Sequence, residues 1–396
     1  MTLLSEQQIA DVKERVDLAS LAQDLGAKLR HSGGRYVGSC PVCGGGARSN
    51  RFEIKNSAWV CAVCPDGGDA IRLVRQVLGL DFAGAIERLG GPRVLSREES
   101  EQLTKQRRER EAKEKAEADG YRKREIAACR RIWESGRSPA DLIGSYWQGR
   151  GLLLPSTALL READSVAYFH GKVTNEQGRS EPRVIARTPA QLALMLDNDG
   201  RATGLHITHL APGGLSKATI VDPDTGEMLP AKKMRGSKKG CHIRVRQPPR
   251  DALLQAARAG RRIRLLMGEG IETVGSVATD LQRKGRLDPL DIFWAAGDLG
   301  NLGGPHLETV AHPTLKGPSG RPQRVPGPDP DPTGPAIAIP DFVTDVVLLG
   351  DGDSEPFLTQ QTLERGRRRY VRPGRRIAIA MAPDGHDFND LVRGAQ

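Results

Sequence analysis

Ile-Arg-Leu-Leu-Met-Gly-Glu-Gly-Ile-Glu-Thr, at residues 263–273, predicts a strand, a glycine-rich turn and the start of a helix in immediate succession. The first five residues are mostly apolar, as in a buried strand of an α/β sheet. In such sheets the residues just beyond the carboxyl ends of the strands line the ligand crevice. Glu269 is therefore expected to project into a crevice, and the glycine on either side of it lets the backbone approach a ligand closely.

Two more predicted strands, at 343–349 and 376–381, also end in acidic runs. The strands of this region are separated by helical segments, which indicates a parallel sheet. The carboxyl ends of parallel strands lie at one edge, so the runs are expected to meet there. The acidic residues of the two runs are Asp351, Asp353, Asp384, Asp387 and Asp390.

Carboxylates that converge without partners repel one another, and a divalent cation relieves that repulsion. Mg²⁺ typically takes one or two carboxylates together with substrate phosphates. A single acidic turn is more simply explained as a helix N-cap, which is the alternative for Asp384 or Asp387. Because three strand ends carry acids, the sequence favours a Mg²⁺ or Mn²⁺ site. Its predicted ligands are Glu269, Asp351, Asp353 and Asp387.

Four cysteines nearer the N-terminus form two C-x-x-C pairs, Cys40/Cys43 and Cys61/Cys64. Zinc takes four ligands in a tetrahedron, and each C-x-x-C turn supplies two sulfurs. A predicted hairpin at 51–61 separates the pairs. A redox C-x-x-C is typically one pair at a helix start, and an iron–sulfur cluster also uses four cysteines. The two pairs across a hairpin favour structural Zn²⁺.

The net charge of the chain indicates which class of molecule it binds. The 396-residue chain has a formal net charge of +10 and a pI of about 9.5, which favours a polyanion, above all nucleic acid. A merely soluble basic protein is the alternative. No apolar run is long enough to predict a membrane span, and the first ten residues contain no secretory signal. Cysteines in metal-type pairs suit a reducing cytoplasm.

Changes in composition predict a multidomain protein of α+β and α/β character. Its parts are a zinc-binding domain (1–95), a charged helical linker (96–137), an α+β middle unit (138–250) and a Rossmann-like, mostly parallel α/β domain (251–396). Helical segments are expected at 5–26 and 69–89. The α/β domain contains a Pro/Gly-rich insert at 303–340, in which residues 317–335 are predicted to be an extended surface loop.

The middle unit combines predicted strands with a basic segment. The strands are expected at 183–187, 193–196 and 204–210. His206 and His209 lie on one of them, where a structural role is favoured over a catalytic one. Residues 232–240 are predicted to form a loop that either binds phosphates or is a solvated turn. The basic residues of that loop are Lys232, Lys233, Arg235, Lys238 and Lys239.

The stretches Ser39-Cys-Pro-Val-Cys, Arg51-Phe-Glu-Ile and Trp59-Val-Cys-Ala-Val-Cys resemble the N-terminal zinc-ribbon domain of bacterial and phage DNA primases, over residues 10–90. In that family a histidine often occupies one ligand position, whereas all four matching positions here are Cys. The resemblance implies contact with single-stranded template DNA, since Arg suits phosphates and Trp stacks on bases. Packing beneath the zinc knuckle is the alternative for Trp59. The residues expected to contact DNA are Arg48, Arg51, Lys55 and Trp59.

The acidic segments, Glu269-Gly, Asp351-Gly-Asp and Asp384-Gly-His-Asp-Phe-Asn-Asp, resemble the motifs of the Toprim domain shared by bacterial-type primases, topoisomerases and some nucleases. With Trp294-Ala-Ala-Gly and Asn301-Leu, they are most similar to the variant in phage and integrative-element primases.

The resemblance to Toprim domains implies roles for three acidic residues. Glu269 would be an acid–base residue or a metal ligand, and Asp351 and Asp353 would bind Mg²⁺. In the family a small residue and Gly usually follow the D-x-D sequence, whereas Ser354-Glu-Pro follows it here.

These resemblances lead us to expect a DNA primase that makes RNA primers on single-stranded DNA from nucleoside triphosphates. A Toprim nuclease and a non-catalytic single-strand-binding protein are the alternatives; a topoisomerase fits less well because little chain is left for a strand-passage domain. The chain ends soon after the last motif, so a replicative helicase is expected as a separate partner. A pull-down with the helicase of its host element tests this.

Overall fold

The computed structural model describes residues 6–32, 34–46, 49–64, 66–91, 97–316 and 322–394. The chain forms two compact units. The first comprises residues up to 114 together with 311–324, and the second comprises 115–310 together with 325 onward. Within the described ranges, no helix combines the length and apolar character needed to cross a bilayer.

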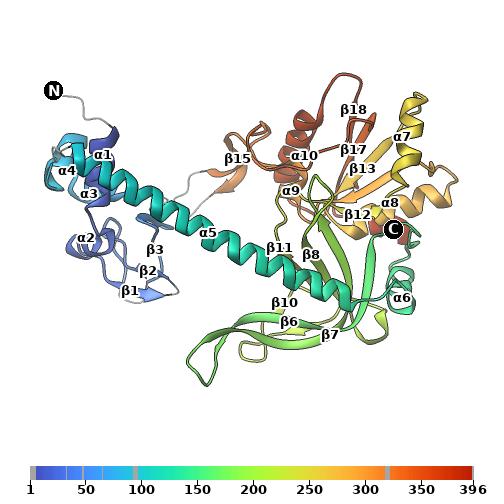
Figure 1. Cartoon of the computed structure of the whole chain (residues 1–396), viewed down its shortest axis with the longest axis horizontal. Coiled ribbons are helices and arrows are strands. Elements are labelled where there is room, and N and C mark those ends of the chain that lie inside the picture. Colours follow the sequence, from blue (N-terminus) through green and yellow to red (C-terminus); the bar gives the residue numbers. More distant parts are fainter. Residues whose placement is uncertain are drawn as a thin grey trace. The chain divides into compact units, whose positions relative to one another are not determined.

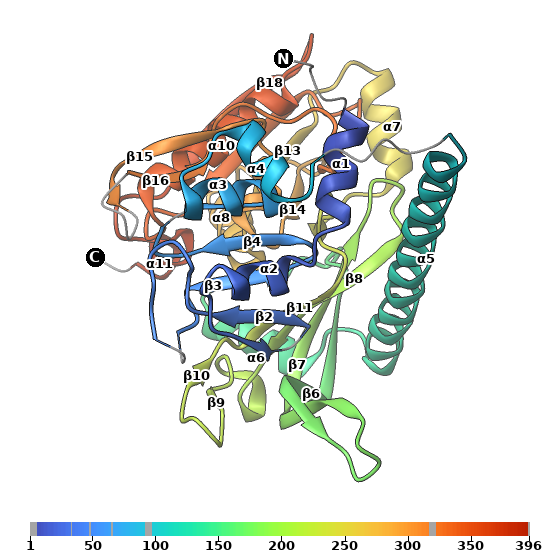
Figure 2. The same ribbon diagram turned by 90° about the vertical axis from the view of Figure 1, so that its left-hand side faces the viewer.

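The first unit packs short helices against an antiparallel sheet of order β1-β2-β3-β4-β5 (Figures 1 and 2). Its core joins Phe52 and Trp59 of the sheet to Leu18 and Leu73 of two helices. The strands are β1 (Leu29–Ser32), β2 (Arg35–Gly38), β3 (Phe52–Lys55), β4 (Ala58–Cys61) and β5 (Asp66–Gly68). The helices are α1 (Glu6–Glu14), α2 (Leu18–Asp24), α3 (Ala70–Leu78) and α4 (Phe82–Arg88).

Two of the predicted helical segments are each divided in the structure. The continuous helix expected at 5–26 is wrong, because Asp17 adopts an extended conformation and caps α2, its carboxylate accepting from Ser20 N at 3.1 Å. The segment at 69–89 is likewise divided, since Gly79 takes the left-handed conformation (φ 67°) that ends α3. Helical spacing of apolar residues persists across such breaks, so periodicity alone does not reveal them.

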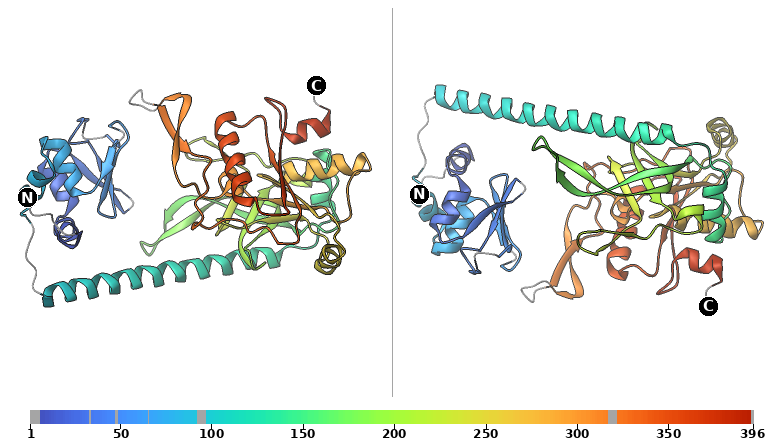
Figure 3. Two further views of the ribbon diagram at one scale, coloured as in Figure 1. Left: turned by 90° about the horizontal axis from the view of Figure 1, so that it is seen from above. Right: turned by 90° about the horizontal axis from the view of Figure 1, so that it is seen from below.

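Residues 97–135 form one continuous helix, α5 (Arg97–Ser135), seen in Figure 3. Charge pairs four residues apart support it, including Arg130–Glu134 at 2.7 Å. Near its C-terminal end Cys129 is buried and packs with Ile132 and Trp133 against the sheet of the second unit. The helix is therefore solvated along much of its length and anchored at this end.

The second unit contains an antiparallel sheet of order β11-β8-β7-β6. Its strands are β6 (Leu160–Thr174), β7 (Ser180–Leu196), β8 (Ala202–His209) and β11 (Lys232–Gly236), and the small pair β9 (Ile220–Val221) and β10 (Met228–Leu229) lies between β8 and β11 in sequence. The segments predicted at 183–187 and 193–196 belong to the single long strand β7, and the sequence reading missed β6. The basic loop predicted at 232–240 is wrong in its first half, because residues 232–236 are the edge strand β11, paired with β8.

A second sheet, of order β12-β14-β13-β17-β18, forms the rest of this unit (Figure 1). β14, β13, β17 and β18 run parallel, which confirms that prediction, and β12 is antiparallel to β14. The strands are β12 (Ile243–Arg246), β13 (Arg264–Gly268), β14 (Ile292–Ala295), β17 (Asp345–Gly350) and β18 (Arg376–Met381). The helices are α7 (Arg250–Arg258), α8 (Ile271–Arg283), α9 (Leu299–Gly303), α10 (Pro356–Tyr370) and α11 (Phe388–Arg393).

The two sheets of the second unit share one hydrophobic core. Trp147, from α6 (Asp141–Gly149), packs in that core with Met195 of β7, Ile243 of β12 and Phe293 of β14. The boundary predicted at residue 250 therefore does not separate two independent domains, and it leaves β12 on the wrong side. The sequence reading erred because β12 precedes the first helix of the α/β region and enters its sheet from the edge.

The Pro/Gly-rich insert is partly regular. β15 (Thr309–Lys316) and β16 (Pro322–Pro326) pair as a two-stranded sheet. The extended loop predicted over 317–335 is thus wrong at 322–326, and residues 317–321 lie outside the described parts of the chain.

Candidate functional sites: a four-cysteine cluster and an acidic strand edge

The four paired cysteines come together in the first unit. Their sulfur atoms all lie within 4.8 Å of one another, with Cys40 Sγ 3.7 Å from Cys64 Sγ and Cys43 Sγ 3.7 Å from Cys61 Sγ. A tetrahedron of sulfurs at the usual Zn–S length of about 2.3 Å has edges of about 3.8 Å. The cluster therefore fits a structural zinc ion, with all four ligands from cysteine.

The local chain explains how the sulfurs meet. Each C-x-x-C turn directs a backbone amide at its first sulfur, Val42 N at 3.3 Å and Cys64 N at 3.4 Å. The hairpin between the pairs turns at Asn56 and Ser57, both left-handed (φ 51° and 59°), as in the two-residue turn that suits the twist of antiparallel strands. Strand pairing thus carries Cys61 back to the first knuckle.

The residues of this unit predicted to contact DNA differ in exposure and in their existing contacts. Trp59 is 2 % exposed, its Nε1 donates to Asp69 O at 3.0 Å, and its ring stacks on Phe52. It therefore packs beneath the knuckle and is not available to stack on a base. Lys55 is exposed, and Arg51 Nε donates to Ser49 Oγ at 3.1 Å. Arg48 lies outside the described residues.

The acidic residues of the second unit follow the carboxyl ends of neighbouring parallel strands. Met267 of β13 is in register with Leu348 of β17, and Gly350 of β17 with Met381 of β18. The segments beyond these residues consequently leave the sheet at the same edge. The acids carried there are Glu269 after β13, Asp298 after β14, Asp351 and Asp353 after β17, and Asp384 and Asp387 after β18. Sequence reasoning missed Asp298, which also caps α9.

The carboxylates at this edge raise one another's pKa. Burial raises the pKa of Glu269, and the charge of Asp351 raises it further. Burial also raises the pKa of Asp351, with Asp387 and Asp353 acting in the same direction. One oxygen of Asp351 accepts from Thr273 Oγ1 at 2.9 Å, and the backbone amide of Phe388 also acts to lower its pKa; the other oxygen, Oδ1, is buried and makes no hydrogen bond of good geometry in the described structure.

This edge has the donor chemistry of a divalent-cation site. A buried, unpartnered carboxylate oxygen beside like charges is costly, and a hard cation would relieve it. The carboxylates do not form a closed cage: within the described residues, the four cysteines are the one group of three or more ligating side chains whose atoms lie within 4.8 Å of one another. An open arrangement suits Mg²⁺, which keeps several waters and takes phosphate oxygens.

The turns after β17 and β18 are tied together. Gly352 N donates to His386 O at 2.9 Å, and a Cβ at Gly352 would lie 2.1 Å from Pro383 O, so only glycine fits there. Asp387 also serves as the N-cap that the sequence suggested, because its carboxylate accepts from Asp390 N at 2.8 Å. The unusual Ser354-Glu-Pro sequence still starts a helix, since the carboxylate of Glu355 accepts from two amides at the start of α10.

A basic cluster surrounds Glu272 in the first turn of α8, beside Glu269. Lys217 Nζ lies 2.9 Å from its carboxylate, an Arg150 nitrogen 3.3 Å and Lys232 Nζ 3.7 Å, and the hydroxyl of Tyr146 donates to it. Burial opposes ionisation, but the neighbouring lysines hold the pKa of Glu272 down to about 2. Three cations around one carboxylate leave a surplus of positive charge. Lys217 and Arg150 were not predicted, because each is an isolated basic residue in sequence.

The other predicted basic residues are spread over β11 and the turn after it. Arg235 makes two hydrogen bonds to Glu125 of α5, at 2.7 and 2.9 Å, so its charge is already paired. Lys233 lies over the ring of Tyr168. Lys238 Nζ lies 2.7 Å from Asp298 at the acidic edge, and Lys239 is exposed.

His206 and His209 are buried on β8, and Nδ1 of His206 has no hydrogen-bond partner among the described residues. Burial lowers the pKa of each to about 4, so both are neutral near pH 7. His209 Nδ1 lies 2.8 Å from Thr188 Oγ1.

Comparison with known families matches two segments. Residues 4–105 match the CHC2 zinc finger family, and residues 123–245 match a domain of unknown function, DUF7146. The chain has no match among curated proteins.

Several solved structures are similar at low identity. The zinc-binding and RNA polymerase domains of the Aquifex aeolicus primase are 14 % identical, with 99 % of this chain and 83 % of that chain covered and a TM-score of 0.36. A DNA primase domain from Pseudomonas aeruginosa is 14 % identical over 68 % and 74 % of the two chains (TM-score 0.34). The E. coli primase catalytic core is 16 % identical over 70 % and 74 % (TM-score 0.33). Because these TM-scores are low, the firmest result is the zinc finger: residues 4–105 of this chain are similar to the CHC2 zinc ribbon of the primase DnaG.

Proposed function

We propose that this protein is a DNA primase, which synthesises short RNA primers on single-stranded DNA during replication of a phage, plasmid or integrative element. The observation that carries the proposal is the edge of the parallel sheet, where half-buried and exposed carboxylates lie beside a surplus of basic side chains. A chain that also carries a primase-type zinc finger has the parts for template-directed nucleotidyl transfer. The order of the acidic motifs along the parallel sheet supports a Toprim domain.

The acidic edge would hold the catalytic cation. Asp351, Asp353 and Glu269 are the proposed ligands of Mg²⁺ or Mn²⁺, with Asp387 nearby. When bound, such ions lower the pKa of an attacking hydroxyl and neutralise the charge on a leaving phosphate. The pKa of Glu269, raised by burial and by the charge of Asp351, indicates that this part of the edge lacks sufficient compensating positive charge, which a bound cation would supply.

Basic residues around this edge would bind the phosphates of nucleoside triphosphate and template. Lys232, Lys217 and Arg150 share the carboxylate of Glu272, and the charge of Lys232 also acts on Glu269. An ion pair with Asp298 likewise holds Lys238 at the acidic edge. Paired cations held in place lose less side-chain entropy when they bind phosphate than mobile ones do.

The zinc finger would contact single-stranded template through exposed basic residues. Lys55 at the tip of the hairpin and Arg51 near Cys43 are the described candidates. A replicative helicase acting in trans is part of the same proposal.

The deciding experiment measures Mg²⁺-dependent incorporation of ribonucleotides on single-stranded DNA. The full chain is compared with Asp351→Asn, which removes the charge of this half-buried carboxylate and keeps its shape. We expect the variant to lose at least about a hundredfold in rate, as for removal of a group that acts in the transition state. Asp280→Asn, at a partly exposed residue of α8 that pairs with Lys284, is the matched control and should keep full activity.

Other outcomes identify the alternatives. Mg²⁺-dependent cleavage of DNA that Asp351→Asn abolishes would support a nuclease. Tight binding of single-stranded DNA with neither synthesis nor cleavage would support a non-catalytic binding protein. Incorporation that survives Asp351→Asn would overturn the assignment of the acidic edge.

A further inference from the structure

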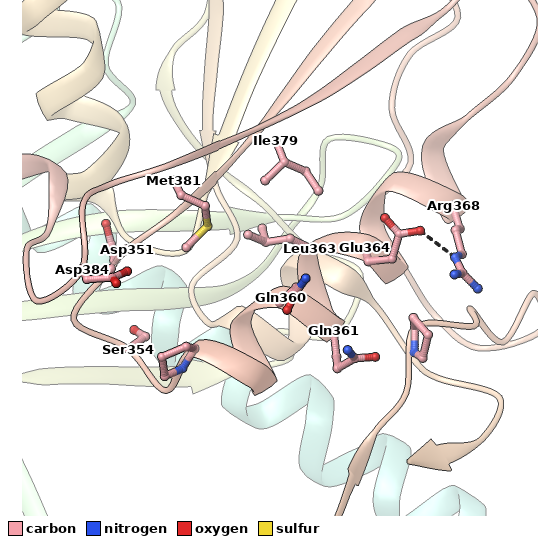
Figure 4. A pocket seen from close by; sticks show the side chains of 13 residues that line it. Asp351, Ser354, Gln360, Gln361, Leu363, Glu364, Arg368, Ile379, Met381 and Asp384 are labelled. Atoms are coloured by element: carbon pink, nitrogen blue, oxygen red, sulfur yellow. Dashed lines mark hydrogen bonds and ion pairs between the residues drawn. The ribbon is translucent and has the colours of Figure 1, made fainter. Parts of the chain in front are cut away.

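A cavity of about 540 Å³ opens directly beside Asp351, between helix α10 and the edge strand β18 (Figure 4). Asp351, Ser354 and Asp384 lie at one end of it, whereas Glu364 and Arg368 lie at the other. Small-molecule sites typically enclose about 300–1,000 Å³, so this cavity has the size of a ligand site. It extends from the acidic edge on the side away from β13 and its basic cluster, because β17 lies between β13 and β18.

One wall of the cavity is apolar. Ile379 and Met381 are consecutive residues on one face of β18 and are 38 % and 47 % exposed, although that face is turned toward α10. Leu363 of α10 completes this surface and is itself buried. Apolar side chains left open at the wall of a cavity favour a ligand with a flat or apolar body.

Polar groups line the facing side. Gln360 and Gln361 on α10 bring two amides, each able to donate and to accept hydrogen bonds. At the far end, Glu364 pairs with Arg367 and Arg368, whose nitrogens lie 2.6 and 2.8 Å from it, and Arg368 also pairs with Asp329 at 2.5 Å, so the charges there balance. The far end is therefore a closed ion pair, and the carboxylates beside Asp351 are the free charge of the cavity.

A ligand suited to this cavity has an apolar, planar body with hydrogen-bonding edges and a group that binds a carboxylate-held cation. A nucleotide has those features: the base and sugar match the apolar wall and the amides, and the phosphates match the cation at Asp351. We infer that the α10–β18 cavity holds the base and sugar of a free nucleoside triphosphate whose phosphates lie at Asp351. This inference rests on the proposed function and adds the place of the nucleoside, including side chains outside the acidic motifs.

The test compares the binding of Mg²⁺-ATP with that of Mg²⁺ inorganic triphosphate, which has no nucleoside. Two variants of the full chain probe the cavity. Ile379→Trp fills it from β18, and Gln361→Ala removes one amide from α10. Val184→Trp, at an exposed position of β7, and Gln255→Ala, at an exposed position of α7, are matched controls.

We expect wild type to bind Mg²⁺-ATP more tightly than Mg²⁺ triphosphate. Ile379→Trp should weaken ATP binding about tenfold, the equivalent of about 1.4 kcal/mol, and Gln361→Ala by a smaller factor. Neither should change triphosphate binding by more than about twofold, and the controls should match wild type on the scale of measurement error.

Other outcomes would contradict the inference. Equal affinity of wild type for the two ligands, or equal losses for both in Ile379→Trp, would show that the cavity does not hold the nucleoside. If Ile379→Trp weakens the binding of a primer oligonucleotide and leaves the binding of Mg²⁺-ATP unchanged, the cavity belongs to the growing strand and the inference is overturned. If these variants behave as wild type while Asp351→Asn still abolishes primer synthesis, the proposed function stands and the inference fails alone.

Discussion

At the scale of single residues, the half-buried carboxylate of Asp351 and the buried carboxylate of Glu272 have pKa values shifted in opposite directions. Asp351 lies among other acids, and its pKa is raised by burial and by the charges of Asp387 and Asp353. Ionisation of Asp351 is therefore disfavoured unless a cation is bound nearby. Glu272 is also buried, yet the lysines around it outweigh burial and lower its pKa to about 2. The first carboxylate is suited to take up a metal, and the second to hold cations in place.

Glu272→Gln tests the second of these roles through stability. A depressed carboxyl pKa contributes stability that is present above the unfolded-state value of about 4.3 and is lost as pH falls toward the folded value of about 2. Removing one partner of a buried ion cluster costs about 3–5 kcal/mol. We therefore expect the variant to be less stable by roughly that amount at pH 7, with the difference from wild type shrinking between about pH 4.3 and 2.

Tryptophan fluorescence during chemical denaturation measures this difference. Trp133, Trp147 and Trp294 all lie in the second unit, so the signal reports mainly on the unit that contains Glu272. Glu227→Gln, at an exposed position, is the control. A difference that stays constant from pH 7 to pH 2 would contradict the role of the ionised carboxylate.

At the scale of elements, the zinc cluster and the sheet of the first unit depend on each other. Cys61 ends β4 and Cys40 follows β2, so the metal joins two strands that are already paired with β3. The core of the unit is small and includes two of the ligands, Cys40 and Cys61. A structural zinc in such a unit contributes directly to its folding free energy.

Removal of zinc by a chelator should consequently unfold the first unit and spare the second, whose cores are made of its own residues. Hydrogen exchange followed by mass spectrometry measures both in one sample. Peptides covering β3, β4 and α3 should lose protection, whereas those covering β13 and β17 should keep it, and added zinc should restore the first set. Unchanged protection in β3 and β4 would mean that the cysteines hold no structural metal.

At the scale of the whole molecule, the net charge of +10 and the basic side chains of both units favour a polyanion. Binding to single-stranded DNA should weaken linearly in logarithmic salt concentration, with a slope of about −0.7 per phosphate neutralised. Lys55→Gln removes one proposed contact and should reduce the magnitude of that slope by about 0.7. Lys284→Gln, paired with Asp280 on α8, is the control and should leave it unchanged. Salt-titrated fluorescence anisotropy gives the slopes, and identical values for wild type and Lys55→Gln would remove Lys55 from the interface.

The sequence by itself determined the local features. C-x-x-C spacing fixed which sulfurs could form a knuckle, apolar runs ending in Asp351 and Glu269 predicted parallel strands with acidic ends, and residues 51–61 predicted the hairpin. Each of these depends on residues close in sequence, where steric and hydrogen-bonding preferences are strong. The same local signals failed at Asp17, where a cap interrupted a helical pattern that continues on both sides.

Only the tertiary structure decided which distant groups meet. Lys217 and Arg150 reach Glu272 across more than fifty residues, Trp59 is buried beneath the zinc knuckle, and β12 joins a sheet from beyond the predicted domain boundary. The cavity between α10 and β18 likewise exists only once both elements pack at the end of the parallel sheet. The physical reason is that the pairing of one side chain with a partner far along the chain is a property of the packed molecule, and local periodicity does not encode it.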